Sequence, residues 1–285
     1  MSFAIGRYVP YNSFLHRMDP RAKIMATIFL MVAVFMNYPN WSMRLLMGGV
    51  IFIFLCVLLY VSRMSLRSIL SSLRPLWFTL VFLLLIYIAV PQQNNTLGIA
   101  WDLNGWVVYW DSFAEAFRII MRFVMTIMLT MILTATTKPL DLTYAVEWYL
   151  SPLKVFNFPA AEIAMMLSIA LRFIPTLLED SDRIMKAQAS RGVDFKHGRI
   201  MARITGITSL IIPLFVSSFI RSEDLAEAME CRGYDPRAKR SRYRKLSFSW
   251  GSLAGLLVCA AIMAGFITVS AMNLDFFALM GLTVK

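Results

Sequence analysis

The sequence predicts an all-α polytopic membrane protein with about five transmembrane helices and a helical cytoplasmic region. Of its 285 residues, 59% are hydrophobic and 16% are charged, and the mean hydropathy is +0.65. An average globular chain is about half apolar and a quarter charged. The apolar residues gather in runs of the length that crosses a bilayer. Fourteen of the 28 lysines and arginines lie between Arg183 and Lys245, and such a block marks the cytoplasmic side.

Residues 1–136 form a predicted N-terminal membrane region with four spans, at residues 24–38, 43–61, 75–90 and about 113–136. The first span is short for a hydrocarbon core of about 30 Å and needs its flanks. The loop 62–74 carries three arginines and no acid, which places this loop and the N-terminus in the cytoplasm. Residues 91–112 have no lysine or arginine and are placed outside. There, Asn104-Gly105 between β-forming residues favours a small hairpin.

The fourth span carries charge on one face. Glu115, Arg118 and Arg122 recur at spacings of three and four residues. Charge inside a membrane helix is costly, so these side chains are expected to face protein or to pair with each other. They lie toward the end assigned to the outer side, against the usual distribution of positive charge. An ion pair within the helix and a functional contact both fit this pattern.

Residues 137–247 are predicted to be a cytoplasmic or interfacial region of helices. An amphipathic helix is expected from Pro139 to Leu153. The apolar runs 160–178 and 200–220 contain Pro175 and Pro213, and each either enters the bilayer or packs as a long helix. Polar, helix-favouring runs follow both.

The last region, 248–285, holds a span at 248–271 and an outer tail. The span is rich in small residues, and the spacing Gly251-x-x-x-Gly255 permits close contact with another helix, predicted to belong to a membrane partner.

One phrase occurs twice, at the ends of the two polar runs. The first copy, at 187–194, reads AQASRGVD, and the second, at 228–235, reads AMECRGYD. Arg-Gly is common at the end of a helix, because glycine adopts the left-handed conformation there and arginine complements the negative end of the helix dipole. Each copy taken singly therefore fits ordinary helix capping.

Capping does not explain the rest of the repeated phrase. It requires neither the small residue before arginine, Ser190 or Cys231, nor the alanine one turn earlier, Ala187 or Ala228. Small residues let another backbone approach, and a guanidinium group offers five fixed donors to a carboxylate. Two such helix ends predict a pair of docking tips for a two-fold or pseudo-two-fold partner.

Catalytic and cofactor-binding patterns are missing from the sequence. It contains no Gly-x-x-x-x-Gly-Lys-[Ser/Thr] loop for ATP and no nucleophile elbow. The two histidines, His16 and His197, lack metal-ligand spacing, and three scattered cysteines indicate neither a disulfide framework nor a metal cluster. No nucleic-acid-reading module accompanies the basic block. The sequence therefore predicts a non-catalytic chain that binds no cofactor, no metal and no nucleic acid.

Three segments carry a resemblance to a known family. The N-terminal run Gly6-Arg7-Tyr8-x-Pro10-x-x-Ser13-x-x-His16-Arg17-x-Asp19-Pro20-Arg21-x-Lys23 resembles that of T components shared among several vitamin transporters. Arg172-Phe173-Ile174-Pro175 through Gly192 is similar to a first coupling helix, and Pro213 to Tyr234 is similar to a second. The chain thus resembles the transmembrane T component of energy-coupling factor transporters, which import vitamins and transition-metal ions into prokaryotes. The family phrase is typically Ala-Arg-Gly, and here Ser190 and Cys231 stand in the first place.

The resemblance implies a subunit of the prokaryotic cell membrane that couples other proteins. Each tip arginine would sit in a groove of one of two ABC-type ATPase subunits, which bind ATP and Mg. Closure of that pair would move both helices and reorient a separate substrate-binding S component. The implied ATPase-coupling residues are Ser190, Arg191, Gly192, Cys231, Arg232 and Gly233, supported by Ala187, Ala228, Pro175 and Pro213.

Two other interpretations remain open at this point. An integral-membrane enzyme acting on lipid-phosphate substrates would use the basic block to bind headgroups. A stand-alone permease would place the charged face of the fourth span in its pathway.

Overall fold

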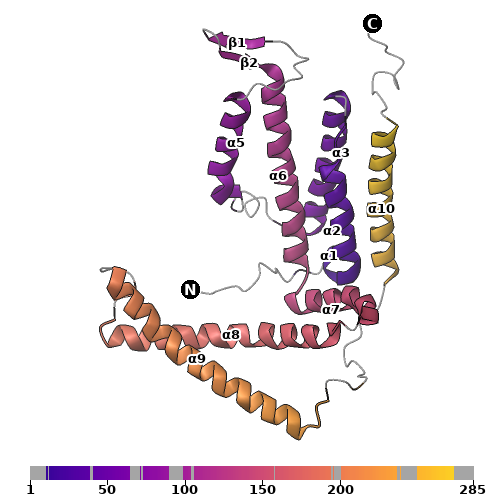
Figure 1. Cartoon of the computed structure of the whole chain (residues 1–285). Helices are drawn as coiled ribbons and strands as arrows, with labels where there is room; N and C mark the ends of the chain where they lie inside the picture. The colour runs from indigo at the N-terminus through magenta and orange to yellow at the C-terminus, as the bar shows by residue number, and fades with distance from the viewer. Residues whose placement is uncertain are drawn as a thin grey trace. The chain divides into compact units, whose positions relative to one another are not determined.

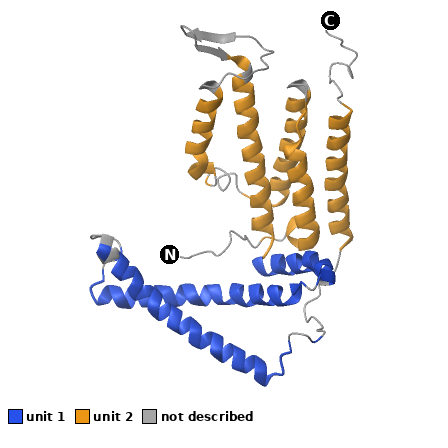
Figure 2. Cartoon of the chain, viewed as in Figure 1, with its two compact units in different colours: residues 1–5, 139–245 blue, residues 6–138, 246–285 orange. Residues whose placement is uncertain are grey.

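The computed structural model describes residues 11, 13–38, 41–64, 71, 73–89, 99–103, 106–156, 158–193, 195, 200–235, 238 and 249–272 (Figure 1). The chain divides into two packing units (Figure 2). Unit 1 comprises Met1–Ile5 and Pro139–Lys245, and unit 2 comprises Gly6–Lys138 and Leu246–Lys285. The first and last membrane regions of the sequence therefore fold together.

Nine elements belong to unit 2: α1 (Phe14–Arg17), α2 (Pro20–Phe35), α3 (Trp41–Val61), η1 (Arg74–Leu76), α5 (Trp77–Ala89), β1 (Ile99–Leu103), β2 (Trp106–Tyr109), α6 (Trp110–Thr136) and α10 (Trp250–Ala271). Unit 1 contains α7 (Pro139–Leu150), η2 (Ser151–Phe156), α8 (Ala160–Ser190) and α9 (Ile200–Cys231). These are the elements among the described residues, and they confirm the all-α class with one small hairpin added.

The centre of unit 2 is α2, which packs against α10, α6 and α3. Its entry is fixed locally, because the Asp19 side chain caps the helix by accepting from the Arg21 backbone N–H at 2.9 Å, and Pro20 occupies the first turn. The N-terminal motif thus acts as the start signal of α2. Along the helix, Ala22 and Ala33 are buried, and these small side chains let the neighbouring helices approach.

The small residues of α10 pack on the chain's own N-terminal segment. Ser252 is buried, and its hydroxyl oxygen accepts from the Asp19 backbone N–H at 2.9 Å. A Cβ added to Gly251 would lie 2.8 Å from the Phe14 ring, and one added to Gly255 would lie 2.7 Å from the Met18 methyl group. A side chain at either position would therefore have to displace the end of the Phe14 or Met18 side chain from its contact with α10. Contact of this helix with a membrane partner stays a prediction.

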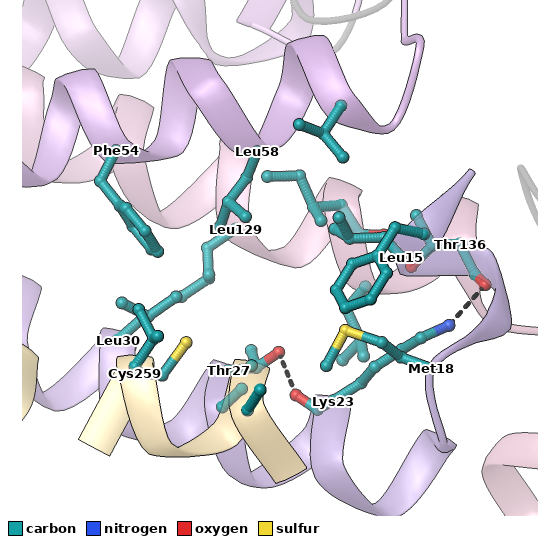
Figure 3. A pocket seen from close by; sticks show the side chains of 18 residues that line it. Leu15, Met18, Lys23, Thr27, Leu30, Phe54, Leu58, Leu129, Thr136 and Cys259 are labelled. Carbon is teal, nitrogen blue, oxygen red and sulfur yellow. Dashed lines mark hydrogen bonds between the residues drawn. The ribbon is translucent and has the colours of Figure 1, made fainter. Parts of the chain in front are cut away.

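Lys23 ties the beginning of α2 to the end of α6. Its side chain is buried, and Nζ donates to the Thr136 carbonyl at 2.8 Å and to the Thr137 hydroxyl at 3.4 Å. The ammonium group thereby meets the negative end of the α6 dipole, which supplies the partners that a buried charge requires. It borders an almost wholly apolar cavity of about 370 Å³ between α2, α3, α6 and α10 (Figure 3).

Five helices in the described part of the chain are long and apolar enough to cross a membrane: Met43–Val61, Ser112–Thr136, Ala160–Ser190, Ile204–Cys231 and Trp250–Ala271. The number matches the prediction, and three of these are predicted spans. The other two predicted spans, 24–38 and 75–90, form helices of 16 and 13 residues, too short by this criterion because 16 residues rise only about 24 Å. The other two helices that meet this criterion of length and composition are α8 and α9, whose apolar runs the sequence left unassigned.

The predicted hairpin is confirmed. Strands β1 and β2 pair antiparallel, with Trp101 opposite Val108 and Leu103 opposite Trp106. The turn residues Asn104 and Gly105 lie outside the described residues. Helix α6 begins at Trp110, directly after β2.

Candidate functional site

The two copies of the repeated phrase lie at the ends of α8 and α9 in unit 1. Within this unit α7 packs on α8, and α8 packs on α9. Pro175 and Pro213 lie inside α8 and α9, which continue through them rather than ending there. Each long helix therefore connects an apolar first part to a polar end.

The end of α8 is closed by a Schellman motif. Gly192 has φ +89°, its backbone N–H donates to the Ala189 carbonyl at 3.0 Å, and the Val193 N–H donates to the Gln188 carbonyl at 3.1 Å. These are the two reversed bonds that end a helix through a left-handed glycine.

The end of α9 repeats this arrangement at equivalent positions. Gly233 has φ +68°, its N–H donates to the Glu230 carbonyl at 2.8 Å, and the Tyr234 N–H donates to the Met229 carbonyl at 3.0 Å. The capping interpretation is thus confirmed for both copies. It accounts for the glycines and the backbone, and leaves the arginines without a structural role in the cap.

The side chains of both tips are exposed. This holds for the small residues and alanines as well as the arginines: Ala187, Ser190, Arg191, Ala228, Cys231 and Arg232. The Ser190 hydroxyl bonds back to the Lys186 carbonyl at 3.1 Å. Neither tip guanidinium forms a hydrogen bond or ion pair with another described residue. The described residues contain no group of three or more potential metal ligands, and what the tips expose is guanidinium donors next to small side chains.

An ion pair joins the two helices away from their tips. Asp180 Oδ2 of α8 lies 2.5 Å from Arg221 Nη2 of α9, and their side chains are 15% and 33% exposed. Composition and periodicity gave these residues no individual role. The signal that would have found them is opposite charge at equivalent places in the repeat.

The Asp180–Arg221 pair has the same separation in sequence as the tips. Asp180 and Arg221 are forty-one residues apart, as are Arg191 and Arg232. On each helix, the tip arginine lies eleven residues after the residue that forms the ion pair, Arg191 after Asp180 and Arg232 after Arg221. Eleven residues are about 16 Å of helix at 1.5 Å per residue. The ion pair thus joins equivalent positions of the two repeats. The helix segments from Asp180 to Arg191 and from Arg221 to Arg232, here called the arms, extend from it with equal length.

The glycines permit a test of the tips themselves. Gly192→Ala and Gly233→Ala each force a side chain into a left-handed conformation, which costs about 1–2 kcal/mol. We expect faster amide hydrogen exchange in the last turns of α8 and α9. Gly265→Ala in α10 is the matched control, because no positive φ and no atom within 4 Å opposes its Cβ. Unchanged exchange at both tips would contradict the assigned caps.

The charged face of α6 is paired within unit 2. Arg118 and Glu115 form the expected ion pair within the helix. Glu115 also accepts from Arg44 of α3, with 2.6 Å between Oε1 and Nη1. The sequence did not predict this second pair, because the two residues are brought together only by helix packing.

Comparison with known proteins gives consistent matches along the chain. The sequence model of the CbiQ family, described as "Cobalt transport protein", matches residues 11–243. A protein of Brevibacillus brevis named "Energy-coupling factor transporter transmembrane protein EcfT" is 40% identical over 267 residues, covering 93% of this chain and 97% of the relative. Proteins with the same name from Macrococcus caseolyticus and Bacillus subtilis are 40% and 38% identical, covering 90% and 92% of this chain and 94% and 97% of their own lengths.

Proposed function

Because this chain belongs to the family of energy-coupling factor transporter transmembrane proteins, we propose that it couples two ABC-type ATPase subunits to a substrate-binding membrane subunit. The complex would be an ATP-driven importer of a micronutrient, a vitamin or a metal ion, in the prokaryotic cell membrane. The chain itself is a multi-pass membrane component and carries no catalytic role in this proposal.

The observation that carries the proposal is that the two tip arginines, and the two residues of the ion pair, are each forty-one residues apart in the sequence. A pair of like ATPase subunits presents two equivalent grooves, and two equivalent tips match them. Each exposed arginine can donate two parallel hydrogen bonds to a carboxylate in its groove. The alanine and the small residue beside it let the helix end approach the groove closely.

The long helices transmit the motion in this mechanism. Closure of the ATPase pair on ATP and Mg displaces both tips, and α8 and α9 carry the displacement along their length. The Asp180–Arg221 pair keeps the helices together where they meet. The apolar first parts of α8 and α9 then act on the substrate-binding subunit, which sets specificity. The N-terminus and the coupling region lie in the cytoplasm, with the ATPases.

Affinity purification of the tagged full-length chain from its native membrane tests this proposal. We expect two ATPase subunits and one small, apolar membrane subunit to co-purify, identified by mass spectrometry. The preparation should hydrolyse ATP, and a Walker A lysine substitution in the ATPases should abolish that activity. Recovery of the chain without any ATPase, from membranes that contain the ATPases, would contradict it.

A further inference from the structure

Unit 2 contains a cluster of arginines that the proposed coupling function does not use. Arg44 of α3 and Arg118 of α6 pair with one carboxylate, that of Glu115, and Arg122 lies one turn beyond Arg118 on α6. Asn37 Oδ1 accepts from Arg118 Nη1 and from Arg122 Nη2, both at 2.9 Å. Two guanidinium groups thus converge on a single neutral oxygen.

The described side chains of this cluster are not electrically balanced. Arg118 and Arg122 lie one turn apart on a helix that qualifies as a membrane span, and the ion pairs of the described residues supply these two guanidinium groups with one carboxylate, that of Glu115 on Arg118. Nε of Arg118 is buried and has no hydrogen-bond acceptor among the described residues. Charge at such a position is costly unless it is paired, and the converging donors of Arg118 and Arg122 can hold a further anion.

The end of α2 indicates how deep in the membrane the cluster lies. That helix stops at Phe35, and Asn37 lies in the segment after it at the level of Arg118 and Arg122. Non-helical backbone is not tolerated in contact with lipid chains, so this level is close to the headgroup region. The exposed Trp110 and Phe113 at the start of α6 fit the aromatic residues that favour this region.

An apolar groove continues from the arginines. A cavity of about 50 Å³ is lined by all three guanidinium-bearing side chains. A second, of about 170 Å³, lies between α3 and α6 and is lined by Arg44, Glu115 and Arg118 together with apolar side chains such as Met121 and Met125. Gly48 and Gly49 border it, and a Cβ on either would meet no atom within 4 Å. Guanidinium groups therefore line part of the same groove that apolar side chains line elsewhere.

We propose that this cluster binds the phosphate of an anionic phospholipid, with an acyl chain in the groove between α3 and α6. A phosphate offers several acceptors, which suit converging guanidinium groups better than one amide oxygen does. The apolar groove selects an amphipathic ligand over free inorganic phosphate. The excess positive charge selects an anionic over a zwitterionic lipid.

Native mass spectrometry of the purified full-length chain, titrated with dioleoyl-phosphatidylglycerol or dioleoyl-phosphatidylcholine, tests the proposal. We expect one retained phosphatidylglycerol and weaker retention of phosphatidylcholine. Arg118→Gln with Arg122→Gln should weaken phosphatidylglycerol binding by at least about tenfold, the equivalent of one charge-assisted hydrogen bond. Arg17→Gln, an exposed cation in α1 of the same unit, is the control and should change nothing.

A second variant keeps the arginines and tests the chain-binding groove. Gly49→Leu has room for its Cβ and fills the groove, so it should also reduce phosphatidylglycerol binding. Equal retention of both lipids by the wild-type chain would overturn the proposal, as would displacement by millimolar inorganic phosphate alone. Loss of a co-purifying membrane protein from the arginine variant, with lipid binding unchanged, would assign the cluster to a protein interface instead. Each readout is independent of ATPase binding.

Discussion

Reversing both tip charges, by Arg191→Glu with Arg232→Glu, is expected to abolish ATPase co-purification and substrate uptake while leaving membrane insertion intact. A charge-assisted hydrogen bond contributes about 1.5–3 kcal/mol, so losing one at each tip weakens association by about a hundredfold or more. The new carboxylates would also repel the carboxylates that are proposed to receive the arginines. The caps survive, because they use backbone atoms and the two glycines. Pull-down from solubilised membranes and uptake into vesicles measure the two effects.

The control has the same change in charge away from the tips. Arg183→Glu with Arg17→Glu alters two exposed arginines, one on α8 and one on α1. This variant should keep both ATPase binding and uptake. Wild-type uptake by the tip variant would refute the coupling proposal, whatever its effect on pull-down.

Local features of the fold were predictable from the sequence because they depend on neighbouring residues. A left-handed glycine ends α8 and α9, and an Asp-Pro pair begins α2, and each involves residues within a few positions. The hairpin before α6 follows similarly from alternating β-forming residues. Hydropathy was less reliable for the spans, since it registers length and composition but not where a helix ends. That is why α2 and α5 were counted as spans while α8 and α9 stayed open.

The ion pairs and buried contacts between residues far apart in the sequence were not predictable in this way. Lys23 meets Thr136 across 113 residues, and Arg44 meets Glu115 across 71. Nothing in either local sequence sets the partner, because helix packing brings the groups together. Asp180 and Arg221 differ in this respect, since the repeat relates them and a search for opposite charges at equivalent positions would have paired them.

Placing two positive charges where α8 and α9 meet, by Asp180→Arg, is expected to separate ATP hydrolysis from transport. The tips stay intact, so the ATPases should still bind and hydrolyse ATP. Arg221 then faces a like charge in place of its partner at 2.5 Å, and the ion pair that fixes the two helices where they meet is lost. The pair is partly exposed, so its stabilising energy is modest, about 1 kcal/mol, and the fold should persist. Uptake is expected to fall at least about tenfold, because one helix can now move without the other.

The reversed pair, Asp180→Arg with Arg221→Asp, provides the matched rescue. It restores opposite charges at the same place and should recover most of the uptake, which a merely misfolded variant would not do. Uptake and ATP hydrolysis are measured on the same proteoliposomes, so that their ratio reports coupling. Normal uptake by the single variant would mean that the arms need no connection where they meet. Both arms are eleven residues long, so the ion pair lies at the same distance from each tip. In the proposed mechanism, a fixed contact at that place makes equal displacements of the two tips move both helices together.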